Sequence, residues 1–221
     1  NVLAVDYRLA PEHRFPTAFL DAQDAFAWLR SHGQQRGLDP DMLAVGGDSV
    51  GGSLAATTCI AERQEGRTQP LLQLLIYPCT ASHQDSGSHQ RLGYGHLLES
   101  ETLQWMFSQY LREEADRHDW RFAPLQTIDL RGLAPAHLVL AEYDPLFDEG
   151  QMYAARMRNA RVSVDESIYA GQVHDFARLG NVTPQAQALR HALSTVLAAA
   201  FERATADTQD MNTTQPSASY I

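Results

Sequence analysis

Hydrophobic and polar residues follow two different patterns along the chain. Short apolar runs predict buried β-strands, whereas apolar residues three and four positions apart predict amphipathic helices. Because strands and helices take turns along the sequence, we predict an α/β protein with a mostly parallel sheet flanked by helices. The predicted strands cover residues 2–7, 42–47, 70–78, 136–144 and 162–169, and the predicted helices cover 17–32, 51–63, 101–112, 149–159 and 184–203.

This alternation is interrupted after the third predicted strand. A polar, irregular stretch comes first and is followed by one amphipathic helix, an arrangement typical of a small cap or lid inserted into an α/β core. The end of the chain is polar and aperiodic, and we predict that it is disordered or is held only by a partner. The chain thus divides into a first core part (1–79), a cap insertion (80–120), a second core part (121–204) and a tail (205–221).

Four glycines surround Ser49 at the point where a predicted strand passes into a predicted helix. The sequence GDSVG at residues 47–51 fits G-x-S-x-G, the nucleophile elbow that lifts a serine hydroxyl above the edge of a sheet. The same turn aims helix N–H groups at the carbonyl oxygen under attack, and we expect the N–H of Val50 to be one oxyanion donor. A glycine-rich turn without catalytic value is the alternative; a phosphate-binding P-loop would need Gly-Lys-Ser/Thr, which is not present.

A serine nucleophile needs a base and a group that orients the base. Of nine histidines, His174 lies in a loop directly after a predicted strand, in YAGQVHDF, although a plain solvated loop histidine is the alternative. Asp144 directly follows another strand, whereas Asp148 and Glu149 suit the first turn of the next helix. In α/β-hydrolases the nucleophilic serine comes first in the chain, the acid second and the histidine third, and Ser49, Asp144 and His174 follow this order.

Longer motifs in the same order resemble the hormone-sensitive-lipase family of serine esterases, in its bacterial branch with a GDSAG-type elbow. They are DYRLAPEHRFPTA, GGDSVGG, DWRFAPL, GLAPAHLVLAEYDPLFDEG and GQVHDF, and they extend the resemblance from residue 1 to about residue 200. The resemblance implies an α/β-hydrolase fold that hydrolyses short- to medium-chain acyl esters through an acyl-enzyme, without a cofactor or metal. Ser49 is then the nucleophile, His174 the proton shuttle and Asp144 the residue that orients the imidazole.

The resemblance also suggests residues for a substrate pocket. The insertion corresponds to the family's cap contribution, so Trp105, Phe107 and Tyr110 are candidates for lining the pocket, and Asp48 of the elbow is a further candidate. Ordinary packing of the helix is an equal alternative for the three aromatic residues.

Three departures from the family pattern stand out. Val50 replaces the usual Ala and narrows the site, and Asp175 replaces the usual Gly after the histidine, where a carboxylate can perturb His174. The family's His-Gly-Gly-Gly segment, which supplies further oxyanion donors, lies upstream of DYRLAPE and is absent from this sequence.

The first predicted strand, at residues 2–7, corresponds to the fourth strand of the family's sheet. The third strand normally separates it from the strand that carries the elbow, and in this sequence the third strand would precede residue 1. We therefore expect these N-terminal strands to be missing, and either an upstream segment or a second copy of the chain to complete the sheet. A homodimer is one way to do so.

Composition and charge restrict the partners. Apolar residues make up 44% of the 221 residues, enough for a large core, and the formal net charge is −10 without a Lys/Arg-rich block. This balance disfavours nucleic acid or an anionic membrane as partner, and no apolar run approaches the roughly 20 residues that span a bilayer. Two cysteines without metal-type spacing suggest a reduced, cytoplasmic protein.

Three functions fit these features. A carboxylesterase acting on a small-molecule ester is the first. A non-catalytic or truncated inactive member of the same fold is the second, although His174 is present. A related hydrolase of amides or lactones is the third, because one triad serves all of these reactions.

Overall fold

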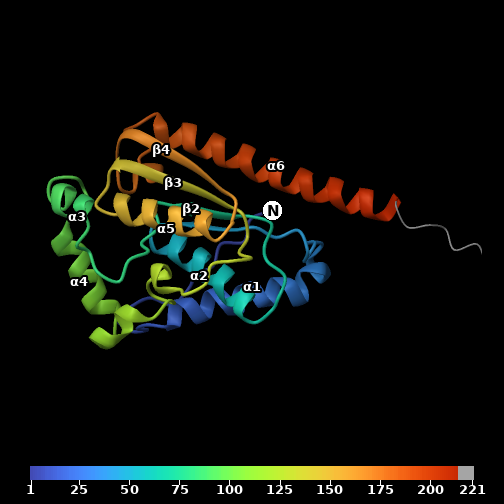
Figure 1. Cartoon of the computed structure of the whole chain (residues 1–221), viewed down its shortest axis with the longest axis horizontal. Coiled ribbons are helices and arrows are strands. Elements are labelled where there is room, and N and C mark those ends of the chain that lie inside the picture. Colours follow the sequence, from blue (N-terminus) through green and yellow to red (C-terminus); the bar gives the residue numbers. More distant parts are fainter. Residues whose placement is uncertain (214–221) are drawn as a thin grey trace, which may run out of the picture.

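The predicted parallel sheet is present in the computed structural model, which describes residues 1–213 (Figure 1). Neighbouring strands are parallel throughout, and their spatial order follows their order in the chain. The carboxyl ends of the strands therefore lie at one edge of the sheet, where ligands bind in open α/β folds. The strands are β1 Val45–Asp48, β2 Gln73–Ile76, β3 Ala136–Tyr143 and β4 Val164–Val173.

Helices cover both faces of the sheet. Along β3, Leu138 and Leu140 join a core with two helices on one face, whereas Val139 and Ala141 pack toward Leu189 on the other face. This burial on both faces explains why β3 is a continuous apolar run rather than an alternating one. One face carries α1 Thr17–His32, α2 Val50–Gln64 and α5 Phe147–Asn159, and the other carries α6 Gln185–Thr213 (Figure 1).

The insertion that interrupts the alternation of strands and helices lies at one end of the sheet, on the left in Figure 1. A buried aromatic cluster fastens it to the core, because Phe107 and Leu103 of the insertion pack with Phe15, Phe122 and Leu146. Its helices are α3 Gly87–Leu92, α4 Ser100–Tyr110 and the 3₁₀ helix η2 Glu114–His118, and the other 3₁₀ helices are η1 Gly33–Arg36, η3 Pro124–Gln126 and η4 Phe176–Arg178.

The strand predicted at residues 2–7 is not formed. This segment has no regular structure, and Val2 is 96% exposed. A strand is held by hydrogen bonds to a neighbouring strand, and within residues 1–213 β1 pairs with β2 alone. Residues 2–7 thus have no strand beside them, and an apolar run by itself does not make a strand.

The last helix is longer than predicted. α6 continues through Thr213, into the segment predicted as a disordered tail. Between Gln185 and Thr213 the sequence contains neither Gly nor Pro, so nothing in it stops the helix. Residues 214–221 of that tail lie outside the described residues.

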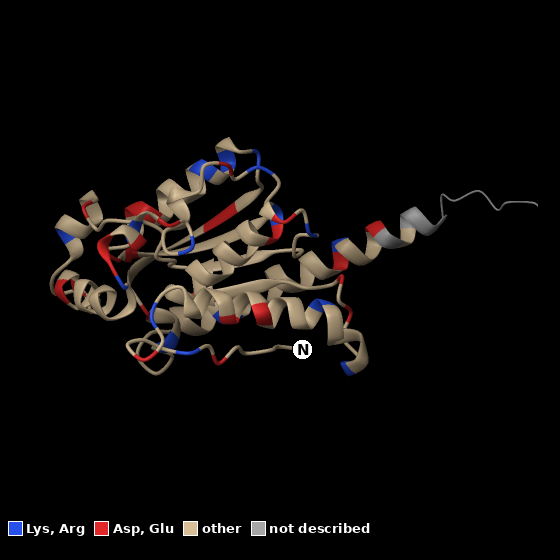
Figure 2. Ribbon diagram, turned by 90° about the horizontal axis from the view of Figure 1, so that it is seen from below, with Lys and Arg blue, Asp and Glu red and all other residues tan. Residues whose placement is uncertain are grey.

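Acidic and basic residues are interspersed along the helices and loops, as Figure 2 shows. Within residues 1–213, no helix combines the length and the apolar character that crossing a bilayer requires.

Candidate active site

Ser49 lies in the tight turn between β1 and α2. Its backbone angles are φ 54° and ψ −120°, a region that residues other than glycine rarely adopt. The N–H of Ser49 donates to the carbonyl oxygen of Ile76 at 2.9 Å, which extends the pairing of β1 with β2 by one residue. Pairing to β2 on one side and the start of α2 on the other therefore hold Ser49 in this strained conformation.

Close backbone packing explains one glycine of this turn directly. A Cβ atom on Gly47 would lie 2.4 Å from the carbonyl carbon of Gly51, a distance that no side chain tolerates. A Cβ atom on Gly51 would meet nothing within 4 Å. Close packing against a neighbour therefore explains Gly47 but not Gly51.

The three residues predicted as a triad lie together at the carboxyl ends of three strands. His174 Nε2 is 3.0 Å from Ser49 Oγ, and His174 Nδ1 is 2.6 Å from Asp144 Oδ2. Asp144 and His174 are 1% and 4% exposed. Because the carboxylate accepts from Nδ1–H, the other ring nitrogen is free to accept the proton of the serine hydroxyl.

The other acids of the same stretch have different partners. Glu142 accepts from the N–H of Gly171 at 2.7 Å, and Asp148 accepts from the N–H of Ser88 at 2.7 Å. Glu149 is buried between the sheet and the insertion. Only Asp144 of these acids has a hydrogen bond to His174 among the described residues.

Asp175, which replaces the family's usual glycine, takes a left-handed conformation with φ 62°. Glycine adopts this region without strain, so the position suits the glycine that the resemblance leads us to expect there. The hydrogen bonds of His174 nevertheless go to Ser49 and Asp144 and not to Asp175.

Asp48 of the elbow is engaged by a residue that the sequence did not single out. Arg178 Nε donates to Asp48 Oδ2 at 2.9 Å, and the carboxylate of Asp48 raises the pKa of the Arg178 guanidinium. Since Arg178 lies in η4, just after His174, this ion pair joins the histidine loop to the elbow. No local pattern reveals it, because the two residues are far apart in sequence.

Tyr77 is a second residue that sequence reasoning missed. It follows β2 directly, its ring is fully buried, and its centroid lies 4.6 Å from that of the His174 ring. Burial, together with the nearby Asp48 and Asp175, raises the pKa of the Tyr77 hydroxyl. The available signal was its place at the carboxyl end of a strand, immediately before Pro78.

Val50 is the first residue of α2 and is 43% exposed. Its N–H is among the first-turn donors that have no partner within a helix, so it is available to an oxyanion beside Ser49.

The aromatic residues proposed for a pocket have different surroundings. In α4, Phe107 is buried against Phe122 with ring centroids 5.2 Å apart, and Tyr110 packs edge-on against Phe15 at 5.8 Å. Trp105 is 62% exposed. The helix thus directs Phe107 and Tyr110 into the cluster that fastens the insertion to the core.

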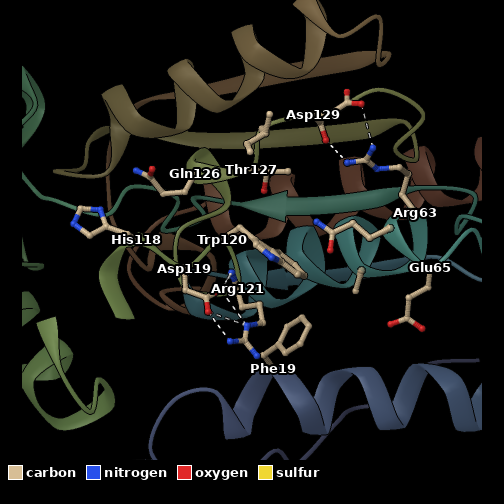
Figure 3. Close-up of a pocket in the computed structure, with 13 residues that line it drawn as sticks. Phe19, Arg63, Glu65, His118, Asp119, Trp120, Arg121, Gln126, Thr127 and Asp129 are labelled. Atoms are coloured by element: carbon tan, nitrogen blue, oxygen red, sulfur yellow. Dashed lines mark hydrogen bonds and ion pairs between the residues drawn. The ribbon is translucent and has the colours of Figure 1, made fainter. Parts of the chain in front are cut away.

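A pocket of about 680 Å³ opens elsewhere on the molecule, between α1, the end of α2 and the stretch 118–129 (Figure 3). Its lining includes none of the three triad candidates. Arg63 and Arg121 face it, but each is already paired, with Asp129 at 3.3 Å and with Asp119 at 2.5 Å. Within the described residues, no group of His, Cys, Asp and Glu side chains is arranged to hold a metal ion.

Known proteins resemble the chain over most of its length. It is 46% identical to an ethyl acetate hydrolase of Pseudomonas putida and 42% identical to a carboxylic ester hydrolase of Mycobacterium tuberculosis, over 84% and 81% of the chain. It spans 58% and 49% of the length of these relatives. A solved ester hydrolase from the metagenome of Lake Arreo superposes with a TM-score of 0.86 at 40% identity, covering 89% of this chain and 62% of that one.

The family described as alpha/beta hydrolase fold matches residues 1–178, which include Ser49, Asp144 and His174. The match confirms the resemblance to the hormone-sensitive-lipase family that the motifs indicated, and the parallel sheet flanked by helices agrees with it. The chain belongs to the α/β-hydrolase fold family.

Proposed function

We propose that this protein is a serine carboxylesterase in which Ser49 is the nucleophile, His174 the general base and acid, and Asp144 the residue that orients the imidazole. One observation carries the proposal: the unbroken hydrogen-bonded series from Ser49 Oγ through both ring nitrogens of His174 to Asp144. The names of the relatives, which are ester hydrolases, support the same chemistry.

The reaction follows from this geometry. His174 Nε2 takes the hydroxyl proton as Ser49 Oγ attacks the ester carbonyl, and the N–H of Val50 stabilises the oxyanion. The imidazolium gives that proton to the departing alcohol, which leaves an acyl group on Ser49. A water molecule then attacks the acyl-enzyme, with His174 as base, and releases the acid and the free hydroxyl.

Replacing the nucleophile tests the proposal. We expect Ser49→Ala to lower the turnover of p-nitrophenyl acetate by about 10³-fold or more, because the acyl-enzyme no longer forms. The melting temperature changes little, since the hydroxyl contributes no packing. Activity that survives in Ser49→Ala excludes the triad, and a wild-type protein that binds esters without turning them over supports a non-catalytic member of the fold.

The second part of the proposal concerns acyl length. Phe107 of α4 packs in one cluster with Leu146 of the core, so the cap lies against the core. This arrangement favours a covered and finite pocket over an open lipid-binding surface. We expect rates to be highest for acyl chains of about eight carbons or fewer, without interfacial activation. A series of p-nitrophenyl esters measures this, and rates that keep rising with longer chains contradict it; an amide analogue in the same series distinguishes esterase from amidase activity.

A further inference from the structure

A buried carboxyl group and a buried imidazole face each other behind the acid loop, which is the loop that follows β3 and carries Asp144. Glu149 is fully buried and His89 is 4% exposed, and Glu149 Oε2 lies 3.3 Å from His89 Nε2. The geometry at this distance gives neither atom a hydrogen bond among the described residues, and the Cys79 thiol is a further polar neighbour of the carboxyl group. Two such atoms in a dry interior are costly unless they share a proton.

The other carboxyl oxygen of Glu149 fastens the acid loop to the end of β2. Oε1 accepts from the N–H of Thr80 and, at 3.0 Å, from the N–H of Ala81. The hydroxyl of Thr80 in turn donates to the carbonyl oxygen of Glu149 at 3.1 Å. Three hydrogen bonds thus connect the first turn of α5 with the chain that leaves the neighbouring strand.

A second attachment lies beside the first. The hydroxyl of Ser88 donates to the carbonyl oxygen of Pro145 at 2.6 Å, and its N–H donates to Asp148 at 2.7 Å. The acid loop is therefore held at three residues that follow Asp144, namely Pro145, Asp148 and Glu149. The loop itself orients Asp144, whose Oδ1 accepts from the N–H of Leu146 at 2.8 Å while Oδ2 bonds His174.

The surroundings keep the pair uncharged. Burial raises the pKa of Glu149 to about 7, and burial lowers the pKa of His89. Below neutral pH a protonated carboxyl group therefore faces a neutral imidazole, and a small rotation of either side chain would let Oε2 donate its proton to Nε2. The charged and titratable groups that face the pair or its immediate neighbours are Cys79, Asp85, Arg91, Arg117, Asp144 and Asp148.

We propose that Glu149 is a positioning residue for Asp144: with His89 as its proton partner, it holds the acid loop so that Asp144 bonds His174. This inference rests on the proposed function of Ser49, His174 and Asp144. Glu149 has no hydrogen bond to the nucleophile or to the imidazole of His174, so its effect passes through the loop and, once the carboxyl ionises near pH 7, through the field of its negative charge.

Two variants of Glu149 separate these effects. Glu149→Ala removes the bonds to Thr80 and Ala81, and we expect kcat to fall by about 10²-fold with KM nearly unchanged, because a small displacement of a catalytic group has this effect. Glu149→Gln keeps an acceptor for both N–H groups, so most of kcat returns. The amide in Glu149→Gln cannot acquire the negative charge that the wild-type carboxyl acquires as the pH rises. We therefore expect the acid limb of its kcat/KM profile to lie at lower pH than that of the wild type.

Glu166→Gln is the matched control, since Glu166 lies on β4, pairs with Arg158 near the end of α5 at 3.1 Å and takes no part in the acid loop. We expect it to keep the wild-type kcat and pH profile. All variants are made in the full-length gene product. Folded Glu149 variants with the wild-type kcat and pH profile overturn the proposal, and if Glu149→Ala does not fold, the pH profile of Glu149→Gln decides.

A readout without substrate separates this proposal from the proposed function. The proton between His174 Nδ1 and Asp144 gives a low-field proton resonance, which we expect to shift or broaden in Glu149→Ala and to stay in place in Glu166→Gln. An unchanged resonance in a folded Glu149→Ala contradicts the positioning role even if no ester is turned over. Activity that survives in Ser49→Ala contradicts the proposed function instead.

Discussion

At the scale of single residues, the proposed mechanism requires His174 to have a fixed tautomer and a fixed position. Asp144 determines the tautomer through Nδ1, Tyr77 lies against the ring, and Arg178 ties the following turn to Asp48. These contacts differ in strength. The bond to Asp144 is buried, whereas the side chain of Arg178 is 68% exposed and its ion pair is screened by water. Asp144 therefore contributes most to the orientation of the imidazole.

We expect Asp144→Asn to lower kcat by about 10³- to 10⁴-fold, with a small change in KM, because an amide facing Nδ1 favours the wrong tautomer. Steady-state hydrolysis of p-nitrophenyl acetate measures the effect. Asp41→Asn is the control, since Asp41 is an exposed carboxylate outside the site and should leave kcat unchanged. Near-wild-type kcat in Asp144→Asn means that another acid orients His174.

At the scale of elements, the elbow depends on how closely β1 approaches α2. The backbones at Gly47 and Gly51 leave no room for a side chain on the first of these residues, and this contact fixes the angle at which the strand passes into the helix. Ser49 takes its strained conformation from that angle.

Two alanine substitutions test this contact. We expect Gly47→Ala to destabilise the fold by about 1–3 kcal/mol, because its Cβ forces the strand and the helix apart, and to lower kcat by displacing Ser49. Gly51→Ala meets open space in the first turn of α2, so its stability should equal or exceed that of the wild type. Urea unfolding and hydrolysis rates measure both, and equal effects of the two substitutions contradict the close-packing explanation.

The sequence predicted most of these elements and the candidate triad because both depend on local pattern. Continuous apolar runs identified β2 and β3, and the position of Asp144 and His174 after strands distinguished them from other acids and histidines. The strand at residues 2–7 was wrong because an apolar run forms a strand only beside another strand, and within residues 1–213 none pairs with it, in line with the expectation that its neighbour is missing. Glu149 looked like an ordinary first-turn acid of a helix, and only the fold shows that it is buried against His89.

At the scale of the whole molecule, Glu149 links folding stability to pH. Its pKa is raised to about 7 in the fold from 4.5 without the fold, because burial disfavours the ionised form. A group with a raised pKa contributes stability that is fully present below the lower value and is lost as the pH rises through the higher one. For Glu149 the loss falls between about pH 4.5 and 7 and amounts to roughly 3 kcal/mol. His89 acts in the opposite sense, because burial lowers its pKa and its stabilising effect is lost as the pH falls.

Comparing Glu149→Gln with the wild type isolates the contribution of the carboxyl group, since all other ionisable groups are shared. We expect the free energy of unfolding of Glu149→Gln, minus that of the wild type, to increase steadily from pH 5 to pH 7.5, because only the wild type must keep an ionising carboxyl in its interior. Urea titrations at closely spaced pH values give this difference. Glu166→Gln should give a difference that is nearly constant over the same range, since the carboxylate of Glu166 is paired with the partly exposed guanidinium of Arg158. A constant or falling difference for Glu149→Gln means that the carboxyl is already ionised below pH 5, as it would be if His89 remained protonated beside it.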